Sequence, residues 1–208
     1  MINALLVIVS PLKTWQRILA AKPSVGYILF TYLLPMMILV SVGEAYGLVR
    51  WGKMQGEVPH LVKFSKGEAA VFEAFQFAIL FVLVIVNAGL LKSTCSTFHS
   101  RHTFRQGFTA VAYGLSPLFL FRLLNMFTEV SPWISWLIGI LLTISVLYNG
   151  IPLIMDPDPA HAFGLYVITS LLLFFTTGLL ELVVAMTLRG NFPKLMSLFS
   201  QWGARLPL

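Results

Sequence analysis

Three glutamates lie within long, mostly apolar stretches of this chain: Glu44, Glu73 and Glu181. A carboxylate that faces lipid costs several kcal/mol, so each of these side chains should face protein or a water-filled path. Intramembrane carboxylates carry protons, ions or solutes in some membrane proteins. In others they only join helices, through hydrogen bonds worth about 1 kcal/mol or less. Both interpretations stay open for these residues.

Other polar residues accompany two of the glutamates at helical spacing. Glu73, Gln76 and Asn87 share one narrow sector of a helix. A second stripe contains Tyr166, Ser170, Thr177 and Glu181. We predict that both stripes face the interior of a helical bundle, as interhelical hydrogen bonds or as the lining of a path.

Glu44 lies inside a GxxxG motif, Gly43 to Gly47. Small residues at this spacing indicate close contact between two helices. Arg122 lies about one turn from the end of its apolar stretch. We expect its side chain to reach towards the membrane surface, as long cationic side chains do.

Residues that could bind a metal occur in two loops. Cys95, His99 and His102 have a spacing that suits a transition metal, and Asp156, Asp158 and His161 should emerge on the same side. Neither set fixes its ligands firmly, since Ser, Thr or Pro interrupts each. No HExxH, GxSxG, phosphate-binding or dinucleotide-binding motif occurs. We therefore predict no metal site, no cofactor and no enzyme activity.

A tyrosine precedes a proline by about one turn in three apolar stretches. The pairs are Tyr32 and Pro35, Tyr113 and Pro117, and Tyr148 and Pro152. Proline removes a backbone hydrogen bond, and a nearby hydroxyl can satisfy the freed group, so we predict shaped kinks; a gating hinge is the alternative.

The last of these pairs belongs to the segment Tyr148 to Ala160, where an apolar run meets polar residues and helix breakers. We predict that it is a packing node and, secondarily, a functional site. The candidate residues of the node are Tyr113, Pro117, Tyr148, Asn149, Gly150, Pro152, Asp156 and Asp158.

The composition identifies the class of protein that holds these residues. Of 208 residues, 58% are hydrophobic and 11% are charged, as in an integral membrane protein. Five stretches approach or exceed the roughly 20 residues that cross a bilayer. We place the spans at 24–49, 70–91, 107–127, 133–155 and 162–188.

Amphipathic segments flank the spans. From Ser10 and Pro11, a good helix start, Leu12, Trp15, Ile18 and Leu19 form one face. A second amphipathic segment follows Asn191. The predicted fold is an all-α integral membrane protein, a five-span helical bundle with amphipathic interfacial helices at both ends. Its parts are residues 1–22, 23–190 and 191–208.

Charge does not orient the bundle. One side would hold Lys13, Arg17, Lys22, Lys92, Arg101 and Arg105, and the other Arg50, Lys53, Lys63, Lys66, Arg189, Lys194 and Arg205. The two counts are nearly equal, so the positive-inside rule predicts no orientation. The net charge of +6 favours contact with anionic lipid headgroups over nucleic acid.

Several short motifs resemble the bacterial branch of the Yip family, the Ypt-interacting proteins. They are SPLKTW from Ser10, YLLP from Tyr32, AYGLSP from Ala112 and LYNGIPLIMDPDPA from Leu147. The resemblance implies a five-span fold in the inner membrane with a cytoplasmic N-terminus, and it carries over no catalytic residue. Eukaryotic relatives act in vesicle traffic with Rab-type GTPases through a long cytosolic N-terminal region. Only a short amphipathic helix stands there in this chain.

These observations predict a non-enzymatic membrane protein that organises membrane or scaffolds a membrane complex. Its partners would be membrane lipids and either another protein or further copies of the chain. The alternative is a small-solute or ion transporter or channel that uses the intramembrane carboxylates.

Overall fold

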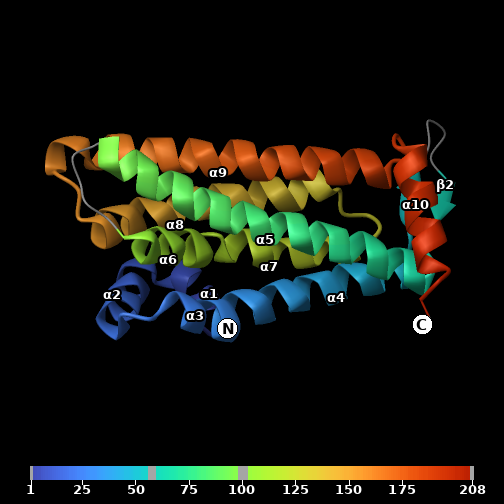
Figure 1. Cartoon of the computed structure of the whole chain (residues 1–208), viewed down its shortest axis with the longest axis horizontal. Helices are drawn as coiled ribbons and strands as arrows, with labels where there is room; N and C mark the ends of the chain where they lie inside the picture. The colour runs from blue at the N-terminus through green and yellow to red at the C-terminus, as the bar shows by residue number, and fades with distance from the viewer. Residues whose placement is uncertain (1, 56–59, 98–102, 207–208) are drawn as a thin grey trace.

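The computed structural model describes residues 2–55, 60–97 and 103–206, and these residues form a mostly helical bundle (Figure 1). The helices before the first loop are α1 (Ile2–Val9), α2 (Pro11–Ala21), α3 (Val25–Ile28), the π-helical turn η1 (Leu29–Leu33) and α4 (Leu34–Arg50). Those after it are α5 (Lys66–Thr97), α6 (Phe104–Gly114), α7 (Ser116–Arg122), the 3-10 turn η2 (Leu123–Met126), α8 (Pro132–Met155), α9 (Pro159–Leu188) and α10 (Pro193–Gly203).

Five helical segments in the described residues are long and apolar enough to cross a membrane, which confirms the predicted fold. Their bounds are Val25–Arg50, Lys66–Cys95, Phe104–Met126, Pro132–Met155 and Ala160–Leu188. The third is the centre of the bundle, because 78% of its most apolar window is buried, against 33% for the first and second. The other spans leave apolar side chains on the outside, where a bilayer would cover them.

The connections between the third, fourth and fifth spans are short. Asp156 ends α8 in the left-handed conformation, and the Asp158 side chain accepts a hydrogen bond from the backbone N–H of Ala160 at the start of α9. These two carboxylates therefore have helix-capping positions. The first loop adds an element that the sequence did not predict, an antiparallel hairpin of β1 (Lys53–Gln55) and β2 (His60–Val62).

Two of the three tyrosine–proline pairs coincide with a change of helical geometry. The π-helical turn Leu29–Leu33 ends two residues before Pro35, and the third span breaks at Leu115, before Pro117. Helix α8, in contrast, continues through Pro152. A proline alone therefore does not determine whether a span breaks in this bundle.

The flanking helices lie at opposite ends of the bundle, α2 near one end and α10 at the other (Figure 1). Both pack against spans. The indole of Trp15 on α2 is fully buried and donates a hydrogen bond to the Val146 carbonyl on α8 at 3.1 Å. On α10, Gly203 approaches Gly67 of α5 so closely that a Cβ on either residue would clash with the other backbone. The apolar face of α2 that the sequence assigned to the interface thus contributes Trp15 and Ile18 to the protein core.

Candidate functional site

The GxxxG motif of α4 brings the end of the third span against the first. A Cβ at Gly47 would lie 2.2 Å from the Met126 carbonyl oxygen, so only glycine permits this approach. Gly43 is also tight, with Leu123 at 3.1 Å from the position of a Cβ. The contact places η2 and the last turn of α7 beside Glu44, which confirms the predicted close helix contact.

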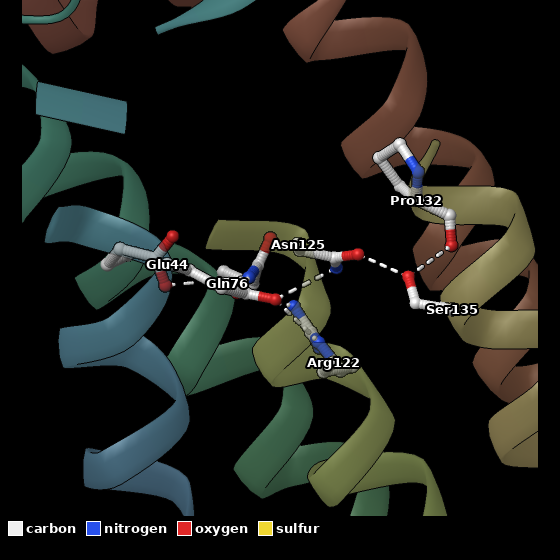
Figure 2. A network of polar contacts seen from close by, with 7 residues as sticks. Glu44, Gln76, Arg122, Asn125, Pro132 and Ser135 are labelled. Carbon is white, nitrogen blue, oxygen red and sulfur yellow. Dashed lines mark hydrogen bonds and ion pairs between the residues drawn. The ribbon is translucent and has the colours of Figure 1, made fainter. Parts of the chain in front are cut away.

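Glu44 of the first span accepts hydrogen bonds from the second and third spans (Figure 2). Arg122 donates from Nε to Oε1 at 3.2 Å and from Nη2 to Oε2 at 3.0 Å, which forms a two-point ion pair. Asn125 Nδ2 donates to Oε1 at 2.9 Å, and Gln76 Nε2 donates to Oε2 at 2.5 Å. Two-point pairing fixes both distance and orientation, so Glu44 is the centre of this network.

The prediction that Arg122 reaches the membrane surface is wrong. Its side chain is only 3% exposed and points into the bundle. The physical reason is Glu44. A buried carboxylate offers the guanidinium a charged partner, and the broken third span places Arg122 directly beside it.

The network continues to the fourth span through Asn125. The Ser135 hydroxyl donates to Asn125 Oδ1 and lies 3.0 Å from the Pro132 carbonyl oxygen (Figure 2). We call Glu44, Gln76, Arg122, Asn125 and Ser135 the charged network. It links α4, α5, the third span and α8 near the end of the bundle that carries α10.

Two further carboxylates lie buried near the charged network with incomplete hydrogen bonding. Oε1 of Glu73 and Oε1 of Glu181 have no hydrogen-bond partner in the structure, and Gln76 Nε2 lies 3.5 Å from the other oxygen of Glu73. Among the arginines and lysines of the described spans, only Arg122 is buried. Glu44, Glu73 and Glu181 therefore share one cation inside the bundle. A buried charge without a partner is costly, so this cluster favours binding of a proton or a cation.

Lys53 closes the site at the membrane surface. Its Nζ donates to the carbonyls of Phe127 at 2.6 Å and Val130 at 3.3 Å. Burial lowers the pKa of Lys53, while the charges of Glu44 and Glu181 oppose that shift. The cavity between Lys53, Glu44 and Glu73 has a volume of only about 10 Å³, about the space of one water molecule.

Asn87 does not belong to the charged network, although it shares the helical stripe of Glu73. It lies 14 residues along α5, about 21 Å away at 1.5 Å per residue. Its Nδ2 donates to Leu83 O at 2.8 Å and to Thr176 Oγ1 of α9 at 3.1 Å. A second bond to α9 comes from Trp136 Nε1 of α8, which donates to Thr177 Oγ1 at 3.1 Å. The bonds to Thr176 and Thr177 join helices and are of the structural kind, whereas the bond to Leu83 lies within α5.

The predicted node divides into a buried part and an exposed part. Tyr113 lies 4.2 Å from Tyr32 and 6.4 Å from Trp15, centroid to centroid. The Tyr32 hydroxyl pairs with the Ser116 hydroxyl, which in turn donates to the Tyr113 carbonyl. We call Trp15, Tyr32, Tyr113 and Ser116 the aromatic cluster.

The rest of the node is partly outside. Gly150 is buried, and its lack of a side chain admits the Trp15 ring, since a Cβ would lie 2.6 Å from the indole. Pro117 is also buried. Tyr148 is 60% exposed, and Pro152, Asp156 and Asp158 are exposed. Asn149 is half-buried beside Tyr148. Tyr148 and Pro152 lie on the outer face of α8, where the Tyr148 ring contacts Tyr166 of α9 at 5.4 Å between centroids.

Comparison with known protein families indicates a membrane protein, as the fold does. The Yip1 domain model matches residues 5–199. The chain belongs to the Yip1 domain family. Neither the curated proteins nor the solved structures provide a match to it.

The Yip1 match covers the aromatic cluster, the charged network and all five spans. It agrees with the predicted family and with a membrane protein that contacts lipid. The loop prediction of Cys95, His99 and His102 lies partly outside the described residues, because 98–102 are not among them. Within the described part of the chain, no group of three or more His, Cys, Asp or Glu side chains could hold a metal ion.

The sequence interpretation of this Yip1-family protein missed three members of the charged network. Arg122 carried a signal, because a cation within an apolar stretch needs a partner inside the bundle, but Asn125 and Ser135 carried none. Small polar residues near the end of a span are common in membrane proteins and do not reveal which helix they contact.

Proposed function

We propose that this Yip1-family protein is a non-enzymatic protein of the inner membrane that organises membrane or scaffolds a membrane complex. The observation that supports the proposal most directly is the rigid attachment of α2. Trp15 enters the bundle between α8 and Tyr113, and Gly150 makes room for its ring. A helix held in this way cannot move independently of the spans.

A fixed helix at the end of a bundle has a mechanical consequence. The outer face of α2 presents Lys13, Gln16 and Arg17, which suit the anionic headgroup region. Because α2 is fixed to α8, insertion into one leaflet imposes the orientation and shape of the bundle on the surrounding lipid. The opposite end has a second packed helix, α10. The proposed orientation places α2 on the cytoplasmic side.

Proteoliposomes test this role. At fixed protein-to-lipid ratio, we expect the wild-type protein to change the distribution of vesicle diameters in cryo-electron microscopy. Trp15→Ala should release α2 and reduce the change, whereas Trp51→Ala, at an exposed indole outside the spans, should not. If vesicles that contain the wild-type protein have the same diameters as protein-free vesicles, the membrane-organising role is excluded.

Scaffolding is tested by native mass spectrometry of the protein released from its own membrane in lipid particles. We expect a defined homo-oligomer or a reproducible protein partner. A single chain without a partner would contradict this part of the proposal. Reporter fusions at the two ends test the orientation, since five spans place the ends on opposite sides.

A second candidate function is proton or cation transport, and one observation favours it. Buried oxygens of Glu73 and Glu181 lack hydrogen-bond partners, as expected for groups that take up and release a small ion. In proteoliposomes, Glu73→Gln/Glu181→Gln should abolish a wild-type flux while the fold is retained. The roughly 10 Å³ cavity favours protons over larger solutes. Equal flux through both proteins would exclude these carboxylates from transport.

A further inference from the structure

A second cavity lies between residues of α2, α6 and α8 and has a volume of about 170 Å³. Figure 1 shows α2 and α6 near the end of the bundle opposite α10. Lys22, Arg105, Gln106 and Thr109 supply the polar wall of the cavity, and Ile18 and Ile154 are among its apolar residues. One ordered water needs only about 10–15 Å³, so the cavity has room for a group of several atoms.

The free hydrogen-bond donors of this cavity are cationic. The Gln106 amide nitrogen donates to the Ile154 carbonyl at 3.2 Å, and its oxygen accepts from the Thr103 backbone. The Thr109 hydroxyl donates to the Arg105 carbonyl at 2.7 Å. Lys22 and Arg105 have exposed side chains, and within the described residues neither forms a salt bridge.

No carboxylate lines the cavity, so its charge is uncompensated. At the same end of the bundle, Lys13, Arg17 and Lys92 add positive charge, while Asp156 and Asp158 are the carboxylates of the described residues there. The end therefore carries five cations against two anions, a local net charge of +3. An anion would be attracted here, and the planar guanidinium of Arg105 offers a fork of donors for oxygens.

The position of the cavity identifies the source of that anion. Lys22 lies three residues before the first span, Arg105 is the second residue of the third, and Ile154 precedes the last residue of the fourth. Three span ends define the level at which hydrocarbon gives way to headgroups. The apolar residues Ile18 and Ile154 can contact the glycerol and upper acyl carbons that accompany a lipid phosphate, which a free phosphate ion lacks.

We propose that Lys22 and Arg105 bind the phosphate of an anionic phospholipid in the leaflet at the α2 end. The site differs from the buried carboxylates in location and in charge. It also does not depend on membrane organisation or on transport, because a bound lipid is compatible with either function. If the protein does not bind lipid at this site, the expected result for vesicle diameters is unchanged.

Retained lipid provides the test. Delipidated protein is mixed with detergent micelles that contain phosphatidylglycerol, and native mass spectrometry counts the bound lipids as a function of lipid concentration. We expect Lys22→Gln/Arg105→Gln to weaken the tightest site by about thirty-fold, from roughly 1 kcal/mol for each cation. The matched control is Lys13→Gln/Arg17→Gln, which removes equal charge from exposed positions at the same end but outside the cavity. Equal weakening in both double variants would overturn the site in favour of diffuse attraction.

Competition on the wild-type protein makes the test independent of any variant that fails to fold. Short-chain phosphatidylglycerol should displace the bound lipid at much lower concentration than inorganic phosphate or phosphatidylcholine. Equal displacement by inorganic phosphate would show a site for the free ion and overturn the lipid assignment. Equal displacement by phosphatidylcholine would show that the net negative charge of the lipid is irrelevant, which also contradicts the proposal.

Discussion

The two buried polar clusters of this protein differ in chemistry although both are built around the third span. The aromatic cluster joins the break of that span to α2 and to the first span through neutral hydroxyl, indole and ring contacts. The charged network joins the end of the same span to the first, second and fourth through a two-point ion pair and amide bonds. One cluster contains no formal charge, and the other contains a buried glutamate and arginine.

The difference shows how burial acts on polar groups inside a membrane. A neutral hydroxyl that loses its partner forfeits a modest hydrogen bond. A buried arginine or glutamate that loses its partner leaves an uncompensated charge. The charged network should therefore be much more sensitive to single substitutions than the aromatic cluster, even though both are almost completely buried.

The largest effect is expected at Arg122. Arg122→Met removes the cation from Glu44 and should lower the free energy of unfolding by about 3–5 kcal/mol, measured by SDS-induced unfolding in mixed micelles. Arg205→Met, at an exposed arginine, is the control. Glu44→Leu/Arg122→Met removes both charges, so its free energy of unfolding should fall less than that of Arg122→Met alone. A double variant that is less stable than the single one would show that charge pairing is not the main contribution.

A smaller effect is expected in the aromatic cluster. Ser116→Ala removes the side-chain partner of the Tyr32 hydroxyl and should lower the free energy of unfolding by about 1 kcal/mol in the same assay. Tyr32→Phe/Ser116→Ala should cost little more than either single change, because the two groups act on each other. A loss as large as that of Arg122→Met would remove the contrast between the two clusters.

The smallest effect concerns Lys53, at the surface of the charged network. Burial lowers the pKa of Lys53 below its ordinary value of 10.5. Between the two pKa values the unfolded chain binds more protons than the folded protein, so stability should rise with pH across that window. Lys53→Met should remove this rise, which unfolding at a series of alkaline pH values would measure. Parallel pH profiles for the wild-type and Lys53→Met proteins would show that Lys53 titrates alike in both states.

The predictable part of the charged network consists of the residues whose type is costly in a bilayer. Glu44, Glu73 and Gln76 were expected to face the interior because a polar group on the lipid face is unfavourable, and they are buried. Asn87 was expected in the same stripe and is buried. It lies about 21 Å further along the helix axis than Glu73, however, and contacts Thr176 instead. A helical stripe predicts the direction of side chains and not which neighbour they meet.

The sequence by itself determined the class of protein, the five spans and the two flanking helices, because the apolar length needed to cross a bilayer and the periodicity of a helix are local properties. It also indicated the close approach at Gly43 and Gly47.

The tertiary structure alone decided the partners. Arg122 turned inward because Glu44 lies on a helix 78 residues away in sequence, and Trp15 entered the core because Gly150 of α8 leaves space for its ring. Tyr148, two residues before that glycine, lies on the outer face of α8. Such choices depend on which helix faces which, and they follow from packing and charge compensation between residues far apart in the chain.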